Sequence, residues 1–260
     1  MKYGFIGCGN MGGAIARALA KSTSDIMLSD PFAAEALASE LNCKSATNTE
    51  VAGTCESIFL AVKPQILESA IAPMAAILRE RKPLIITMAA GIEIKKIEAM
   101  IGTSLPIIRI MPNTPVTVGM GTILYCHNQM VTDQMCSAFL ADMQYAGLLD
   151  PIPESLIDAA SALSGCGPAY VYMFIEALAD GAVACGVPRA KAMTYAANTL
   201  AGAAQMVLQT KEHPGALKDA VCSPGGSTIA GVKALEEHGF RGAVMDCIAS
   251  AYLRTKELGK

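Results

Sequence analysis

The feature that most restricts the fold of this chain is a glycine-rich hexamer, G-x-G-x-x-G, near its start. The hexamer follows an apolar segment at 2–6 and opens a helical pattern over 11–21, as in a βαβ unit. There the three glycines allow a tight turn, close approach of a pyrophosphate and close packing of helix on strand. The N–H groups at the helix N-terminus bind the phosphates. In this context the hexamer predicts a dinucleotide site, formed by Gly7, Cys8, Gly9, Asn10, Met11 and Gly12.

The organisation of the rest of the chain follows from its hydrophobic periodicity. The first part alternates apolar and amphipathic segments, as a parallel sheet with covering helices does. The expected strands are 2–6, 26–29, 57–62, 84–88, 107–110 and 122–125, and the expected helices are 11–21, 34–41, 65–78, 93–100 and 132–145. After Glu154 only helical patterns follow. We therefore expect an α/β fold, with an N-terminal Rossmann-type dinucleotide-binding domain over 1–151 and an all-α domain over 152–260.

Composition narrows the classes of protein to consider. Hydrophobic residues make up 52% of the chain and charged residues 17%. The most apolar stretch, 170–187, contains Glu176 and Asp180, which argues against a membrane-spanning helix and favours a helix packed inside a subunit or between subunits. The net charge of −3 and the lack of a basic run argue against nucleic acid as a partner. The first residues do not resemble a secretory signal, so we expect a cytoplasmic homo-oligomer without a membrane anchor.

The cysteines and histidines indicate neither a disulfide framework nor a metal site. The nine cysteines are odd in number and contain no C-x-x-C spacing. The three histidines, at 127, 213 and 238, share no spacing typical of metal ligands. We therefore expect small buried thiols in a reducing compartment, and no bound metal.

An acidic residue ends the second expected strand. Asp30 lies 18 residues after Gly12, where an acid usually binds the adenosine ribose 2′-hydroxyl and favours NAD over NADP. A carboxylate there would repel a 2′-phosphate by up to about 4 kcal/mol at 4 Å and an effective dielectric constant of 20. An equally good interpretation is that Asp30 only caps the turn that begins with Pro31. The residue therefore raises the odds of NADH use without deciding the matter.

Two other expected strands end in segments that a dinucleotide could contact. The segment A-V-K-P at 61–64 places Lys63 near ribose or phosphate oxygens, and M-A-A-G at 88–91 supplies small residues for the nicotinamide half. Taken singly, a solvated lysine and a tight loop are the commoner explanations. Together they gain weight, because ligands of open α/β sheets gather at the carboxyl ends of the strands.

Beyond single motifs, seven blocks of sequence occur in a fixed order. They are FIGCGNMG at 5–12, AVKP at 61–64, AAG at 89–91, RIMPNTP at 109–115, LSGCGPAY at 163–170, HPGALKD at 213–219 and CSPGGSTI at 222–229. With these blocks the chain resembles the pyrroline-5-carboxylate reductase family over essentially its whole length. The family often has Ser where this chain has Asp30, which again indicates relaxed or NADH-leaning cofactor use.

The resemblance implies reduction of L-1-pyrroline-5-carboxylate to L-proline, the last step of proline biosynthesis, by hydride from NADPH or NADH. It also implies an all-helical dimerisation domain, and dimers that often assemble into decamers. On matching positions it implies cofactor contacts from Ile6, Gly7, Cys8, Gly9, Asn10, Met11, Asn48, Val62, Lys63, Pro64, Ala89 and Ala90. The implied substrate contacts are Gly226, Ser227, Thr228 and, less directly, Glu154.

The turn at 223–228 has a chemistry that suits such a substrate. Its sequence S-P-G-G-S-T opens a helical pattern, so its N–H groups can bind a carboxylate while the glycines allow close approach. An isolated segment of this kind would more often be only a helix cap. The hydroxyl of Thr228 is the candidate bond to the imine nitrogen, and Thr228 is the candidate catalytic residue.

Two other functions would each require residues that differ from those of an imine reductase. A 3-hydroxyacid dehydrogenase shares the two-domain plan but needs a catalytic lysine four residues after Gly167, where this chain has Val171. Oxidation of an alcohol needs a base, whereas reduction of an imine does not, so this absence favours the imine. A regulator that binds NAD(H) without turnover would need a partner surface or a DNA-binding segment, and no basic helix-turn-helix pattern is visible.

Overall fold

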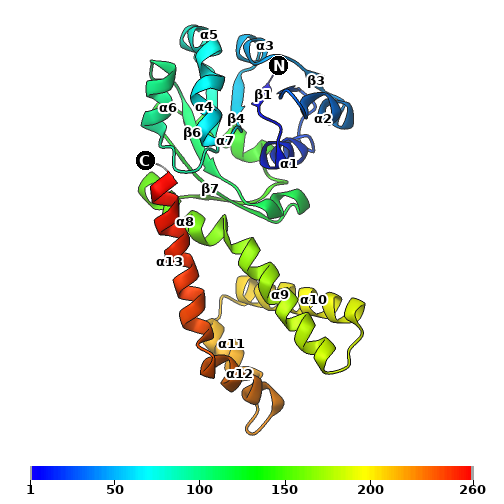
Figure 1. Ribbon diagram of the computed structural model, residues 1–260. Coiled ribbons are helices and arrows are strands. Elements are labelled where there is room, and N and C mark those ends of the chain that lie inside the picture. Colours follow the sequence, from blue (N-terminus) through cyan, green and yellow to red (C-terminus); the bar gives the residue numbers. More distant parts are fainter. Residues whose placement is uncertain (1, 259–260) are drawn as a thin grey trace. The chain divides into compact units, whose positions relative to one another are not determined.

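The computed structural model describes residues 2–258 and contains one eight-stranded sheet of order β3-β2-β1-β4-β5-β6-β7-β8 (Figure 1). Neighbouring strands are parallel, except that β7 runs antiparallel to β6. The strands are β1 (Tyr3–Ile6), β2 (Ile26–Ser29), β3 (Lys44–Ser45), β4 (Ser57–Leu60), β5 (Leu84–Thr87), β6 (Ile107–Met111), β7 (Gly121–His127) and β8 (Gly147–Pro151).

Helices cover both faces of this sheet, which explains why its central strands are mostly apolar. Successive strand residues point to opposite faces, so Phe5 and Ile6 belong to different core clusters. Phe5 stacks on Phe59 with ring centroids 4.4 Å apart. One face is covered by α1 (Asn10–Leu19), α2 (Ala34–Leu41) and α7 (Asp133–Asp142), and the other by α3 (Asn48–Thr54), α4 (Pro64–Ile71), α5 (Ala75–Arg81) and α6 (Ile94–Ile101).

The structure confirms the α/β class and all six expected strands, and it corrects the details. The short strands β3 and β8 and the helix α3 were not expected. The expected helix over 65–78 is two helices separated by a 3₁₀ turn, η1 (Ala72–Met74), because Pro73 interrupts the hydrogen-bond ladder. The sheet is also not wholly parallel, since β6 and β7 are joined by a short segment that contains the 3₁₀ turn η2 (Thr114–Val118).

The chain divides into two compact units. Among the described residues, the first comprises 2–166 and 251–258, and the second comprises 167–250. Helix α8 (Glu154–Ser164) therefore belongs with the sheet, whereas the sequence suggested a domain division at 151/152. The division of the chain into domains at 151/152 stays a prediction.

The second unit consists of helices alone, as expected. They are α9 (Gly167–Ala184), α10 (Arg189–Thr210), α11 (Pro214–Ala220), α12 (Ser227–Glu237) and the first part of α13 (Phe240–Leu258). Within this unit α9 and α10 pack against each other around Ala179, Ala192 and Ala196. Among the helices of residues 2–258, none is both long enough and apolar enough to cross a membrane.

Candidate active site

The loop between β1 and α1 has the geometry that the hexamer predicts. Gly7 has a φ of +97°, and a Cβ there would lie 2.8 Å from the carbonyl oxygen of Ala61. A Cβ on Gly12 would lie 2.4 Å from the Gly7 carbonyl oxygen, so the first and third glycines are needed for packing. A Cβ on Gly9 would meet nothing within 4 Å. The middle glycine therefore faces open space, which is where a pyrophosphate would approach.

Helix α1 begins with N–H groups that are available to a ligand. Gly9 is its N-cap residue, in an extended conformation, and no side chain among residues 2–258 caps this end. The first N–H groups of a helix have no partner within the helix, and they carry a partial positive charge. Gly9 and Asn10 are exposed. The loop therefore fits a dinucleotide phosphate, both in its open space and in its donors.

Pairing in the sheet gathers the predicted cofactor residues at one edge. Ile6 pairs with Ser29 of β2 and with Leu60 of β4, and Leu60 pairs in turn with Thr87 of β5. Because these strands are parallel, the segments that follow each of them meet at the same edge. Those segments contain Asp30, Val62, Lys63, Pro64, Ala89 and Ala90.

Asp30 is held by three backbone N–H groups. Its Oδ1 accepts from Phe32 and Ala33 at 2.9 Å each, and its Oδ2 accepts from Cys8 at 2.8 Å. Burial works to raise the pKa of the Asp30 carboxyl, but these three donors outweigh it and hold the pKa below its ordinary value. Asp30 thus caps the turn, as the alternative interpretation has it, and also contacts the glycine-rich loop.

Other predicted cofactor residues have simple local roles. Asn48 is the first residue of α3, and its Oδ1 accepts the Ser29 hydroxyl at 2.7 Å. Lys63 is exposed and is the N-cap residue of α4, with Pro64 at the first helical position. Ala89 is buried and Ala90 half-buried. Burial raises the pKa of Cys8 to about 12, with a further contribution from Asp30, so its thiol is a poor nucleophile.

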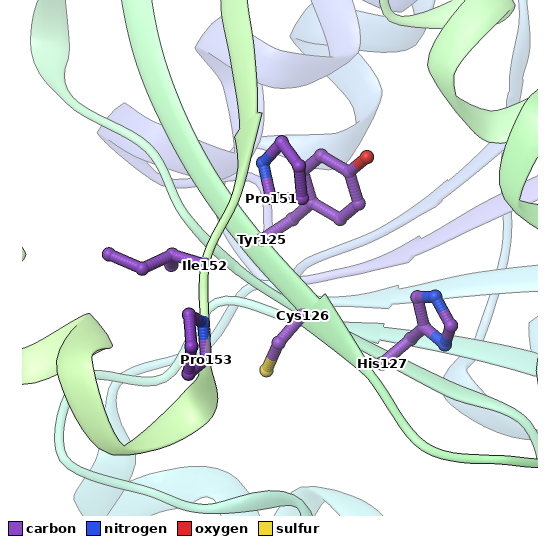
Figure 2. A pocket seen from close by; sticks show the side chains of 6 residues that line it. All are labelled: Tyr125, Cys126, His127, Pro151, Ile152 and Pro153. Atoms are coloured by element: carbon purple, nitrogen blue, oxygen red, sulfur yellow. The ribbon is translucent and has the colours of Figure 1, made fainter.

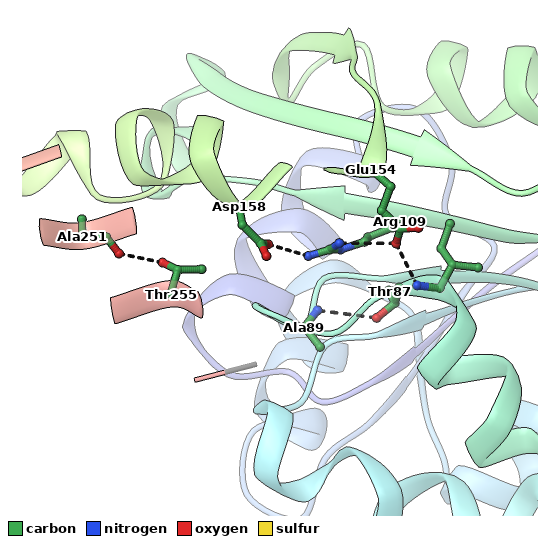
Figure 3. A network of polar contacts seen from close by, with 8 residues as sticks. Thr87, Ala89, Arg109, Glu154, Asp158, Ala251 and Thr255 are labelled. Atoms are coloured by element: carbon green, nitrogen blue, oxygen red, sulfur yellow. Dashed lines mark hydrogen bonds and ion pairs between the residues drawn. The ribbon is translucent and has the colours of Figure 1, made fainter. Parts of the chain in front are cut away.

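A buried arginine, which sequence reasoning did not single out, joins three elements of the first unit (Figure 3). Arg109 on β6 is 1% exposed and contacts Glu154 Oε1 at 3.3 Å and Asp158 Oδ1 at 2.8 Å, both on α8. Glu154 Oε1 also accepts the N–H of Ile94, the first residue of α6, at 2.8 Å. The sequence signal was a charged residue inside an apolar strand, which demands a partner.

The predicted substrate turn lies in the second unit and opens α12. Gly225 has a φ of +69°, and the Gly226 N–H donates to the Ser223 carbonyl oxygen at 3.0 Å. Gly226 is the N-cap residue of α12 and no side chain among the described residues caps this helix. Ser227 and Thr228 are exposed. The structure thus confirms the turn and the helix start, and its free N–H groups can bind an anion.

A shallow hollow of about 320 Å³ lies elsewhere on the first unit (Figure 2). Tyr125, Cys126 and His127 of β7 line it together with 151–153. Burial raises the pKa of Cys126 to about 11, with Glu154 adding to the effect. No predicted site residue lines this hollow, and no group of three or more acidic, cysteine or histidine side chains in residues 2–258 is arranged to hold a metal ion.

Comparison with known proteins agrees with this arrangement. Residues 154–258 match the family model for pyrroline-5-carboxylate reductase dimerisation, and residues 2–91 match that for coenzyme F420-dependent NADP oxidoreductases. The chain is 41% identical to pyrroline-5-carboxylate reductase of Synechocystis, covering 100% of this chain and 99% of that protein. It is 40% identical to the Escherichia coli enzyme, covering 100% of this chain and 98% of that one.

A solved structure extends the likeness to three dimensions. Pyrroline carboxylate reductase of Plasmodium falciparum, determined with NADP bound, superposes with a TM-score of 0.90 at 34% identity and covers 100% of both chains. Sequence and structure therefore agree over the full length, through the sheet and the helical unit alike. The chain belongs to the pyrroline-5-carboxylate reductase family.

Proposed function

We propose that this chain reduces L-1-pyrroline-5-carboxylate to L-proline, with the reduced dinucleotide at the loop 7–12 and the imine at the turn 223–228. Its family makes it an NAD(P)H-dependent oxidoreductase that acts on an imine. The match to pyrroline-5-carboxylate reductases over the whole chain supports the substrate, and the uncapped start of α1 behind the open space at Gly9 supports the dinucleotide. A spectrophotometric assay with pyrroline-5-carboxylate and each reduced cofactor tests it, and no substrate-dependent oxidation of either cofactor would refute it.

In this proposal the first unit holds the cofactor. The phosphates lie against the N–H groups of 9–12, and Asp30 and Asn48 face the adenosine ribose. Lys63 reaches a ribose or phosphate oxygen, while Ala89 and Ala90 leave room for the nicotinamide ring. When bound, the reduced dinucleotide supplies the hydride. The other assigned contacts are Ile6, Val62 and Pro64, through backbone or apolar surface.

The second unit holds the substrate. The N–H groups of Ser227 and Thr228 bind the carboxylate, Gly226 allows it to approach the backbone closely, and the Thr228 hydroxyl orients the imine nitrogen. A protonated imine already attracts hydride, so these residues contribute mainly by positioning. Glu154 of the first unit, already bonded to Ile94 and Arg109, is proposed as a further substrate contact on its resemblance alone.

Replacing Thr228 tests this assignment. Thr228→Ala should lower kcat/KM for the imine by roughly tenfold or more, equal to about 1.4 kcal/mol, because the nitrogen loses its orienting hydroxyl. Thr228→Ser keeps the hydroxyl and serves as the matched control. Steady-state kinetics with both variants decide the matter, since wild-type rates for Thr228→Ala would remove this residue from the mechanism.

The preference between cofactors is a separate part of the proposal. Asp30 is ionised at neutral pH, as an ordinary aspartate is, and its three N–H donors favour the charged form further, so its charge disfavours a 2′-phosphate. We therefore propose relaxed or NADH-leaning use, although a relative has been solved with NADP. Comparison of kcat/KM for NADH and NADPH tests this, and a strong NADPH preference with Asp30 intact would contradict it.

The proposed assembly is a dimer that can build larger oligomers such as a decamer, in the cytoplasm. Self-association is supported by the match of 154–258 to a dimerisation family. Large apolar side chains on the second unit, such as Met173 at 69% exposed and Leu208 at 66%, would need such a partner. Sedimentation of the purified protein measures the oligomer number.

A further inference from the structure

The carboxylate of Asp30 joins two parts of the proposed cofactor site. One oxygen, Oδ1, accepts the N–H groups of Phe32 and Ala33 and so fixes the turn after β2. The other, Oδ2, accepts the N–H of Cys8, which lies between the first two glycines of the phosphate loop. One side chain therefore fixes both the place where a ribose would lie and the loop where a pyrophosphate would lie.

The number of acceptor positions limits what else Asp30 can bind. A carboxylate offers about four lone-pair positions, two on each oxygen. The two N–H groups on Oδ1 fill that oxygen, and the Cys8 N–H fills half of Oδ2. One position remains, on Oδ2. Bidentate capture of both ribose hydroxyls would therefore require the loss of a backbone bond.

We propose that Asp30 is a positioning residue for the phosphate loop as well as a ribose ligand, and that it accepts only one ribose hydroxyl, at Oδ2. This inference rests on the proposed dinucleotide site and deepens it. The Gly7 N–H donates to the Ser29 carbonyl oxygen at 2.8 Å and the Cys8 thiol contacts the same oxygen at 3.9 Å, and the bond from the Cys8 N–H to Asp30 is a further tie between this loop and the end of β2.

Keeping all three backbone bonds at once requires a carboxylate. In Asp30→Asn the amide has one acceptor oxygen and one donor nitrogen. Whichever way the amide turns, its NH₂ group faces either the Cys8 N–H or the N–H groups of Phe32 and Ala33. In Asp30→Ser the side chain is too short to keep all three bonds. Both variants should therefore loosen the loop or the turn, apart from any effect on the ribose.

A cofactor analogue without ribose hydroxyls separates the two roles. The probe is NADH whose adenosine ribose is 2′,3′-dideoxy, so that no hydroxyl of this ribose can donate a hydrogen bond to Asp30. We expect Asp30→Ser and Asp30→Asn to bind this analogue roughly tenfold more weakly than wild type does, because a charge-assisted bond to the loop is lost. Fluorescence titration without imine substrate measures this affinity, and thermal unfolding confirms that each variant is folded.

A matched control removes the same charge nearby. Glu35 is exposed and lies in the first turn of α2. Glu35→Gln should bind the analogue as wild type does, since it leaves the Cys8 bond in place. Wild-type affinity of both Asp30 variants for the dideoxy analogue would overturn the loop role, and an equal loss in Glu35→Gln would assign the effect to net charge and overturn it too.

The count of hydroxyls has its own test. Double-mutant cycles measure the affinity of wild type and Asp30→Ser for NADH and for two analogues, one without the 2′-hydroxyl and one without the 3′-hydroxyl of the adenosine ribose. One of the two hydroxyls should be coupled to Asp30 and the other should not, whereas coupling to both would refute the single acceptor position. These titrations contain no imine, so they test the role of Asp30 independently of catalysis. If the chain binds NADH but does not reduce pyrroline-5-carboxylate, the proposed function is refuted and the role of Asp30 still stands.

Discussion

The two compact units of this chain bury their apolar residues in opposite ways. In the first, two clusters on either side of the sheet enclose large side chains such as Phe5, Phe59 and Ile97 at 0% exposed. In the second, the buried cluster consists of Ala179, Ala192 and Ala196, while Met173, Leu208 and other large side chains are exposed. The first unit has a core of its own, whereas the second needs another surface to cover it.

This difference explains how one chain can serve two purposes. A dinucleotide site needs fixed loops, and a sheet with covered faces supplies them at the carboxyl ends of its strands. A helical unit with little core of its own gains stability from association, so its folding and its oligomerisation are coupled. Mutations should therefore act on intrinsic stability in the first unit and on assembly in the second.

The largest effect should come from the buried arginine of the first unit. Arg109→Ala leaves the carboxylates of Glu154 and Asp158 without their cation. Breaking a fully buried pair costs about 3–5 kcal/mol, and because these carboxylates are 30% and 25% exposed we expect a loss of up to about 3 kcal/mol. Denaturant unfolding measures the loss. The control is Arg17→Ala, which breaks an exposed pair with Glu40 and should cost less than about 1 kcal/mol. Equal losses in the two variants would show that burial of the pair does not matter.

The next effect should appear in assembly. Leu208→Glu places a charge on an exposed apolar surface of the second unit, where the chain alone loses little by it. If that surface is covered by a second copy, the dimer should be weakened by about 2 kcal/mol or more, as at an interface hot spot. Sedimentation over a concentration series measures the shift. Met130→Glu, at an exposed apolar residue of the first unit, is the control and should leave the dimer intact.

A third, smaller effect separates folding from binding inside the first unit. Gly12→Ala forces a Cβ to within 2.4 Å of backbone and should destabilise the fold by about 1–3 kcal/mol. Gly9→Ala meets no protein atom, so its unfolding free energy should stay within about 0.5 kcal/mol of wild type while NADH affinity falls. Thermal unfolding and cofactor titration of both variants test this. Unchanged NADH affinity in Gly9→Ala would mean that the phosphates lie elsewhere.

Much of the fold could be predicted from the sequence, because turns, helix starts and buried strands depend on residues that lie close together in the chain. The glycine hexamer determined the turn, the helix start and the open space at Gly9, and apolar runs determined the central strands. The strand β3 was not predicted, because its two residues, Lys44 and Ser45, are both exposed and give no apolar pattern. The helix α3 had a signal that went unused, the capping box of Thr47 with Glu50.

Features that depend on distant residues need other signals, and some have none in the sequence. The antiparallel β7 follows β6 after a link of nine residues, which is too short for a parallel crossover, so length alone could have indicated it. Glu154 was assigned to the substrate by resemblance, and only the structure shows its carboxylate at Ile94 and Arg109. Its contact with the substrate stays a prediction, as do the other assigned contacts.

The smallest expected effect is on the response of the first unit to acid. The pKa of Asp30 is lowered in the folded chain, because three N–H donors outweigh the opposing effect of burial. A lowered pKa gives stability that is present above the unfolded value of about 3.9 and is lost as pH falls through the folded value. Asp30→Asn cannot ionise, so its unfolding free energy should fall less steeply than that of wild type below about pH 5. Urea unfolding from pH 7 to pH 3 measures both slopes. Parallel slopes would mean that the three N–H groups do not favour the charged form, and the tie between Asp30 and the phosphate loop would lose its electrostatic basis.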